Sequence, residues 1–338
     1  MSEQRSDATE QAVAARYFAT LPWAQVEAVA VRTTADGPWA EDVFWVVAFD
    51  DSDPDVRGEV TVPGSWVQGE SYDALMARLP GLDLQRVIWA MASAEPRTFC
   101  VWRHDRSPQQ ADDDGLVARF VAVVARAGGD ALAAEPLARA LLMAWSAPER
   151  RYHERQHLCD CLFELDALRA DADATVAGLA AAPAVELALW YHDVVYDTHV
   201  HDNEERSALR LVAEVESVGV EAEVVATAAR LVRATAHLGR PADAVLAPDE
   251  ALVVDIDLSI LGQHPLRFAD FEDGIGEEYA HVPTIALRWN RRRFLRRLQA
   301  AAQIFATPTM RARHEAAART NLGALLASSR YALWGMWS

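Results

Sequence analysis

The chain has 338 residues, of which 50 are acidic and 32 are basic, so its formal net charge is −18. This length can supply two domains with separate cores, and a composition that is 51% hydrophobic and 24% charged is typical of a globular protein. The negative charge argues against general binding to DNA or RNA, because phosphate groups would be repelled, so we expect no nucleic-acid polymer as a partner.

Residues 1–112 have the pattern of a small α+β domain. The polar start, MSEQRSDATEQ, does not resemble a signal peptide. Further on, short segments rich in valine and aromatic residues alternate with turns that contain proline, glycine or aspartate, which is typical of strands, and residues 71–79 have the spacing of a helix. We therefore predict the order strand, strand, helix, strand, strand, with the strands at residues 26–33, 43–49, 86–91 and 98–103.

Residues 113–338 have the pattern of an all-α domain, which the polar segment 107–114 links to the first. Alanine- and leucine-rich segments repeat with a period of about 3.6 residues and are separated by glycine and proline. No apolar run reaches about 18 residues, so we expect a cytoplasmic protein without a membrane partner. The predicted helices are 115–127, 135–146, 154–169, 183–194, 203–217, 221–236, 249–261, 284–305 and 309–326.

Histidine and aspartate residues of this second half form a candidate metal site. His157 lies in RYHERQH, His192 and Asp193 end the apolar run AVELALWY, and Asp255 and Asp257 lie in LVVDIDLSILG. Two imidazoles with carboxylates make a mixed nitrogen and oxygen ligand set, which suits a transition metal better than a calcium cage. A folded helical bundle is needed to bring these segments together.

The order of these segments resembles a known family. RYHERQH, HDVVYD, DNEERSA, TAH, DIDLSILG, EEY and ARTNL together are similar to a bacterial family of predicted phosphohydrolases in the HD superfamily, over about residues 115–326. The resemblance implies an HD-type helical bundle that uses a divalent metal ion (Mn, Co, Ni, Zn, Fe or Mg) to hydrolyse a phosphate ester, such as a small nucleotide. One position departs from the family: Glu154 stands where an asparagine usually follows the Tyr152-His153 pair, which puts the substrate in doubt.

Asp255 and Asp257 compete for one ligand position. Residues two apart on a helix point about 200° apart, so one of them is expected to face the ion. Apolar residues accompany Asp257, whereas Ser259 shares the wetter face of Asp255. We expect the more buried face to carry the ligand and therefore favour Asp257, with Asp255 in a supporting role.

Further polar residues are candidates for catalysis and substrate binding. Glu204 or Asp197 can orient or deprotonate a metal-bound water, and Arg151 can reach a phosphate. Asp202 or Asn203 can cap the next helix. Residues 288–297 hold six arginines, which form a solvated helix face, a phosphate pocket or a nucleic-acid contact. The candidates for substrate binding are His153, Asn203, His237, Arg292 and Arg293.

Other histidines and the cysteines leave alternatives open. His199 and His201 form an H-x-H pair that is either a solvated loop or part of a second metal site, which would favour an HD-scaffold oxygenase with two irons. A third alternative is a non-catalytic sensor that binds a nucleotide, and a homo-oligomer is compatible with the sequence. Cys159 and Cys161 point in different directions on a helix, so we interpret both as core residues outside any disulfide framework.

Overall fold

A computed structural model describes residues 13, 15–35, 40–49, 58–93, 96–103, 113–236 and 245–328. The chain divides into two compact units: Met1–Ala111 with His264–Asp273, and Asp112–Gln263 with Gly274–Ser338. The sequence suggested a single division near residue 112. It did not predict that residues 264–273, which hold the first part of helix α12 (Pro265–Glu278), belong to the first unit.

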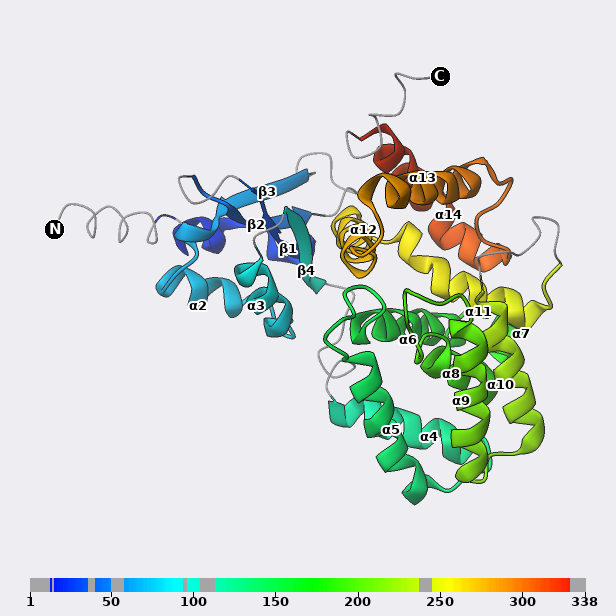
Figure 1. The fold of residues 1–338 in the computed structure, drawn as a ribbon. Helices are drawn as coiled ribbons and strands as arrows, with labels where there is room; N and C mark the ends of the chain where they lie inside the picture. Colours follow the sequence, from blue (N-terminus) through cyan, green and yellow to red (C-terminus); the bar gives the residue numbers. More distant parts are fainter. Residues whose placement is uncertain are drawn as a thin grey trace. The chain divides into compact units, whose positions relative to one another are not determined.

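The first unit contains a four-stranded antiparallel sheet with the strand order β3-β2-β1-β4 (Figure 1). Strand β1 aligns Val31 with Trp45 of β2 on one side and with Phe99 of β4 on the other. Short 3-10 turns at Trp23–Gln25 and Gly64–Trp66 accompany the sheet. The strands are β1 (Val26–Thr33), β2 (Val43–Phe49), β3 (Gly58–Pro63) and β4 (Arg97–Arg103).

The two faces of this sheet carry different side chains, because successive residues of a strand point to opposite sides. Large residues such as Trp45 face a core that helices α2 (Glu70–Met76) and α3 (Leu84–Ala92) also line. The other face carries small residues, including Ala30, which pack with Leu266 of α12. A helical segment from the second half of the sequence therefore belongs to the core of the first unit.

Two predictions in this unit were wrong. Residues 86–91 are helical rather than a strand, because the Asp83 side chain caps α3 by accepting a hydrogen bond from the Arg86 backbone N–H at 3.0 Å. The valine, isoleucine and tryptophan of this segment are typical of strands, and the cap was overlooked. Strand β3 was missed because Glu59 and Thr61 are exposed on an edge strand, which makes the segment polar.

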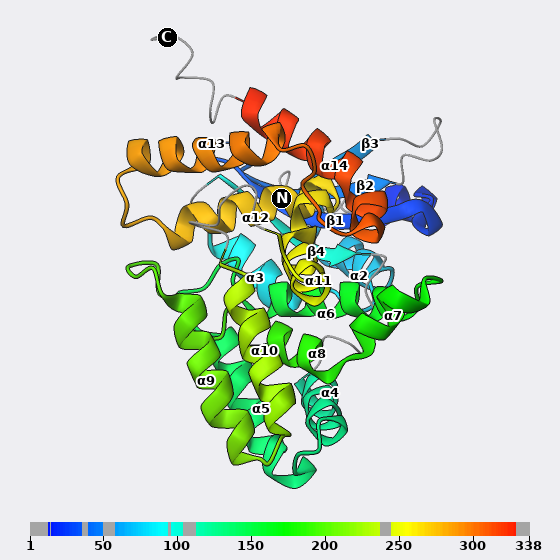
Figure 2. The same cartoon turned by 90° about the vertical axis from the view of Figure 1, so that its right-hand side faces the viewer.

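The described residues of the second unit form helices joined by loops and turns, without a strand (Figure 2). The prediction of a mostly helical second half is confirmed, although α7 and α12 were not among the predicted helices. Its helices are α4 (Asp113–Arg126), α5 (Ala131–Trp145), α6 (Arg155–Arg169), α7 (Ala174–Ala181), α8 (Pro183–Tyr191), α9 (Asn203–Ser217), α10 (Ala222–Ala234), α11 (Pro248–Asp257) with the 3-10 turn η4 (Leu258–Gly262), α13 (Thr284–Ala300) and α14 (Pro308–Ala327).

Helix α8 is the central element of this unit. It packs against α4, α6, α7, α10 and α11, and its residues from Ala184 to Tyr191 are all buried. This explains why its sequence is apolar around the helix, apart from Glu186, which pairs with Arg119 at 2.7 Å. His192 follows as the C-cap of α8, Asp257 ends α11 and His157 lies in the first turn of α6, so these polar residues lie at helix ends, beside rather than within the apolar packing.

Among the described residues, no single helix has the length and apolar character needed to cross a membrane. Helices α7 and α8 meet these criteria together, but the chain bends by 58° between them.

Candidate metal centre

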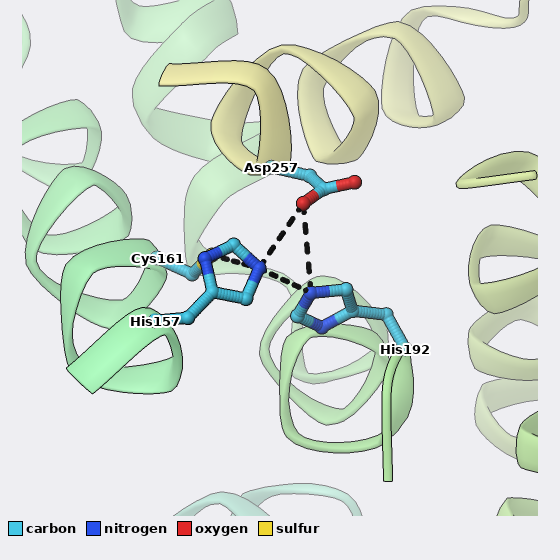
Figure 3. Close-up of side chains that lie close together, drawn as sticks. All are labelled: His157, Cys161, His192 and Asp257. Carbon is cyan, nitrogen blue, oxygen red and sulfur yellow. Dashed lines mark hydrogen bonds and ion pairs between the residues drawn. The ribbon is translucent and has the colours of Figure 1, made fainter. Parts of the chain in front are cut away.

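Donor atoms from three helices converge at one point of the second unit. His157 Nε2 lies 3.0 Å from His192 Nε2 and 3.2 Å from Asp257 Oδ1. Asp193 Oδ2 lies 3.1 Å from His192 Nε2 and 3.7 Å from His157 Nε2. Figure 3 shows that the imidazoles of His157 and His192 point toward the Asp257 carboxylate, although the three residues come from different helices. The structure therefore brings together four of the five residues that the sequence suggested as metal ligands.

The distances between these atoms fit a bound cation. Two ligand atoms that each lie about 2.1 Å from one ion, at tetrahedral or octahedral angles, are about 3.0 to 3.4 Å apart. The closest pairs here are 3.0, 3.1 and 3.2 Å apart. Both imidazoles are 1% exposed, and an ion offsets the cost of burying such polar groups beside two carboxylates.

The second nitrogen of each imidazole has a partner that orients the ring. His192 Nδ1 lies 2.9 Å from the Leu189 carbonyl oxygen, which can only accept, so Nδ1 carries the proton and the neutral ring keeps a lone pair on Nε2. The Tyr152 hydroxyl lies 3.0 Å from His157 Nδ1. The Trp145 ring packs near both imidazoles, with centroids 6.3 Å from His157 and 5.5 Å from His192. These contacts restrict the orientation of both rings so that each Nε2 atom faces the ligand group, as partners of metal-binding histidines do.

Burial and charge act in opposite directions on these groups. Burial lowers the pKa of His157 below its usual range. Burial also acts to lower the pKa of His192, but the charges of Asp193 and Asp257 outweigh it and raise that pKa to about 9. Burial acts to raise the pKa of Asp193, yet the neighbouring His192 and His153 bring it well below its usual range. Without an ion, a proton on His192 therefore partly balances the carboxylates.

Cys161 was missed as a neighbour of this centre. Its thiol and the ligand atoms of His157, His192 and Asp257 all lie within 4.8 Å of one another, a group that can hold a metal ion. Residues four apart share a helix face, so the spacing from His157 already placed it there. Its Sγ lies 3.9 Å from both ring nitrogens of His157, so it flanks the ring instead of lying along the Nε2 lone pair. Asp193 is therefore better placed than Cys161 as the fourth ligand.

Asp255 has a separate task. Its carboxylate accepts hydrogen bonds from the backbone N–H groups of Ala306 and Thr307, at 2.8 and 2.6 Å, and from the Thr307 hydroxyl at 2.7 Å. Burial raises its pKa. The structure places Asp257 in the ligand group, as favoured from the sequence, but the argument for it was wrong: Asp255 is the more buried, with 0% exposure against 13% for the Asp257 side chain.

His153 adjoins the centre and is held by a buried glutamate. Its Nε2 lies 4.0 Å from Asp193 Oδ2, and its Nδ1 lies 2.8 Å from Glu278 Oε2. Its ring stacks on Tyr196 with centroids 4.1 Å apart. Burial acts to lower the pKa of His153, but the charges of Glu278 and Asp193 raise it. The structure therefore places this predicted substrate-binding residue beside the ligand group.

Glu278, in the last turn of α12, was missed in the sequence. It accepts hydrogen bonds from three successive backbone N–H groups, those of Arg151, Tyr152 and His153, at 2.8, 2.8 and 3.0 Å, and from the Tyr196 hydroxyl at 3.0 Å. Burial acts to raise its pKa, but His153 and these N–H groups lower it to about 2. Its position in the EEY segment of the resemblance was the only sign of its importance.

The predicted catalytic residues lie outside the ligand group. Arg151 forms an ion pair with Glu277 at 3.0 Å instead of pointing to the metal ligands. Asn203 bonds the backbone of Asp197 twice, at 3.1 and 2.9 Å, and Asp197 in turn accepts from the His199 backbone N–H at 2.9 Å. These contacts hold the loop that follows the His-Asp pair.

The remaining predicted residues lie in α9, in α13 and in the loop before α9, or cannot be placed. Glu204 is half-buried in the first turn of α9. His199 stacks on His281 with centroids 4.0 Å apart, and His201 is exposed. Arg292 and Arg293 belong to α13, where the Arg293 guanidinium lies over the Trp289 ring. The prediction for His237 falls outside the described residues.

The chain matches no family model, no curated protein and no solved structure in the comparisons.

Proposed function

We propose that the second unit is an HD-type, metal-dependent phosphohydrolase. The observation that supports this most is the convergence of His157, His192, Asp193 and Asp257 from three helices: the two Nε2 atoms lie 3.0 Å apart, and each carboxylate lies 3.1 to 3.7 Å from them. The resemblance of the sequence segments to HD phosphohydrolases agrees with this ligand set. We propose a small phosphate ester, such as a nucleotide, as the substrate, with residues 1–112 left without an assigned role.

The ligand set determines what the site can do chemically. Two imidazoles and two carboxylates suit Mn, Fe, Co, Ni or Zn, and all four are buried or half-buried. A bound divalent ion supplies a water whose pKa is lowered toward about 7 and stabilises charge that develops on phosphoryl oxygens. The residues of the chain hold that chemistry in place: Leu189 fixes the His192 tautomer, and Tyr152 orients His157.

His153 is the best candidate to act on the substrate itself. Glu278 accepts from its Nδ1, and the opposite nitrogen, Nε2, lies 4.0 Å from Asp193 Oδ2, beside the ligand group. There it can hydrogen-bond a phosphoryl oxygen or donate a proton to the departing alcohol. Tyr196 stacks on the ring and shares the Glu278 carboxylate, which restricts the orientation of His153 further.

A direct experiment tests this function. The purified protein is screened against phosphomonoesters and nucleotides with Mn, Co, Ni, Zn and Mg, and wild type is compared with His192→Ala and with His201→Ala. His201 lies in the same chain segment but is exposed, so it is the matched control. We expect hydrolysis by wild type and the control and none by His192→Ala; equal activity of all three would rule out catalysis at this centre.

One observation also favours a second candidate, an oxygenase with two irons. His153 Nε2 lies 4.0 Å from Asp193 Oδ2, so these two residues would hold a second ion. Metal analysis separates the two candidates. Two irons per chain would support the oxygenase, and one divalent ion per chain supports the hydrolase.

A further inference from the structure

Arg150 occupies an unusual position for a charged side chain. It lies between α5 and α6 and is 4% exposed. Its guanidinium donates to three backbone carbonyl oxygens: those of His153 at 2.7 Å, Asp193 at 2.8 Å and Val194 at 3.0 Å. The carbonyls of Asp193 and Val194 belong to the loop that follows α8 and contains the ligand Asp193. The carbonyl of His153 belongs to the turn before α6.

These three bonds join two chain segments that are distant in the sequence. One segment precedes α6 and presents His153, and the other follows α8 and presents Asp193. The functional groups of these two residues, His153 Nε2 and Asp193 Oδ2, lie 4.0 Å apart. Because the guanidinium is planar and its five N–H donors have a fixed geometry, it holds the three carbonyls in a defined arrangement.

Two aromatic rings lie next to the guanidinium. Its central carbon lies 5.4 Å from the Trp145 ring centroid and 5.6 Å from that of Tyr196. Trp145 also packs near both ligand imidazoles, and Tyr196 stacks on His153. Arg150 therefore contacts the two ligand imidazoles through Trp145 and the His153 ring through Tyr196.

We propose that Arg150 is a positioning residue that sets the separation between the Asp193 carboxylate and His153, and through it the geometry of the bound metal. This inference rests on the proposed function, since it presumes that the ligand group binds a metal. Lysine is not equivalent to Arg150, because its three N–H donors all start from one nitrogen, whereas the guanidinium bonds the three carbonyls from two separate nitrogens in a fixed plane. Arg150 itself touches neither the ligand nitrogen atoms nor the carboxylate oxygens in the bonds described.

Metal binding without substrate tests the inference. Co²⁺ is titrated into metal-free wild type, Arg150→Lys, Arg150→Met and the control Arg155→Met by calorimetry, and the visible spectrum of the bound ion reports its coordination geometry. Arg155 is a nearby arginine that pairs with Asp113 at 2.5 Å. We expect both Arg150 variants to bind Co²⁺ about 10- to 100-fold more weakly, as for other residues that support metal ligands, with an altered spectrum, while the control matches wild type.

Thermal melting of the metal-free proteins separates positioning from folding. Arg150→Lys keeps the charge and three N–H donors and is expected to stay folded at the temperature of the titration, so weaker Co²⁺ binding with an altered spectrum in this folded variant supports positioning. Unchanged affinity and spectrum in Arg150→Lys would overturn the inference and leave the proposed function standing. If wild type itself binds no Co²⁺, the proposed function fails and the inference fails with it.

Discussion

The Glu278 carboxylate provides the sharpest quantitative prediction. It is almost fully buried, and its pKa falls from an ordinary value of 4.5 to about 2. At about 1.4 kcal/mol per pKa unit, this corresponds to about 3 kcal/mol of stability when the group is ionised. In Glu278→Gln, the amide oxygen can still accept from the backbone, but the amide N–H₂ cannot accept from His153 and Tyr196. We therefore expect unfolding free energy to fall by about 3 kcal/mol near neutral pH.

The sign of the pH dependence follows from the lowered pKa. The stabilisation by Glu278 is fully present above the unfolded pKa of about 4.5 and is lost as the pH falls toward about 2. Urea unfolding of metal-free wild type and Glu278→Gln, measured at several pH values, should show a difference that shrinks across this window. Glu277→Gln is the matched control: its side chain is 36% exposed and pairs with Arg151, so it should cost at most about 1 kcal/mol. A difference for Glu278→Gln that is small, or that does not change with pH, would refute the reasoning.

Three further predictions concern the ligand group and its supports. Tyr152→Phe removes the hydroxyl beside His157 Nδ1 and should weaken Co²⁺ binding about tenfold or more, measured by calorimetry; unchanged affinity would contradict the orienting role. Asp255→Asn should leave metal affinity near wild type but lower the unfolding free energy by about 1 to 3 kcal/mol in urea, because a carboxylate that holds Thr307 is lost; a selective loss of metal binding would contradict this assignment. The pKa of metal-free His192 is raised to about 9, so a metal ion must displace a proton from its ring. Metal affinity should therefore fall as the pH drops below about 9, and calorimetry in buffers of different ionisation enthalpy should detect the released proton. Metal binding without proton release would contradict this prediction.

Strong periodic patterns in the sequence predicted the overall architecture. The alanine- and leucine-rich segments predicted a mostly helical second half, because an amphipathic or fully buried helix leaves a clear pattern. The valine-rich segments predicted β1, β2 and β4. Local composition failed where a cap or an edge position decided the structure, as at Asp83 and in β3.

Long-range contacts were the part that sequence patterns could not supply. Residues 264–273 join the first unit through side chains such as Leu266. No periodic pattern of apolar residues in the sequence indicates this contact. Asp255 and Asp257 both look like ligands in the sequence, and only the partner at Thr307, about 50 positions further on, separates their roles. Glu278 and Arg150 were overlooked because their importance lies in backbone groups that they bind, and backbone groups carry no residue signature.

The central claim is that the four converging donors bind one divalent ion, and metal titration tests it most directly. Metal-free wild type and a variant with both His157→Ala and Asp257→Asn are titrated with Zn²⁺ by calorimetry, and the metal content is measured after dialysis. The account predicts one tightly bound ion per chain in wild type and none in the double variant, with both proteins folded. Absence of binding by wild type, or equal binding by the two proteins, would contradict it.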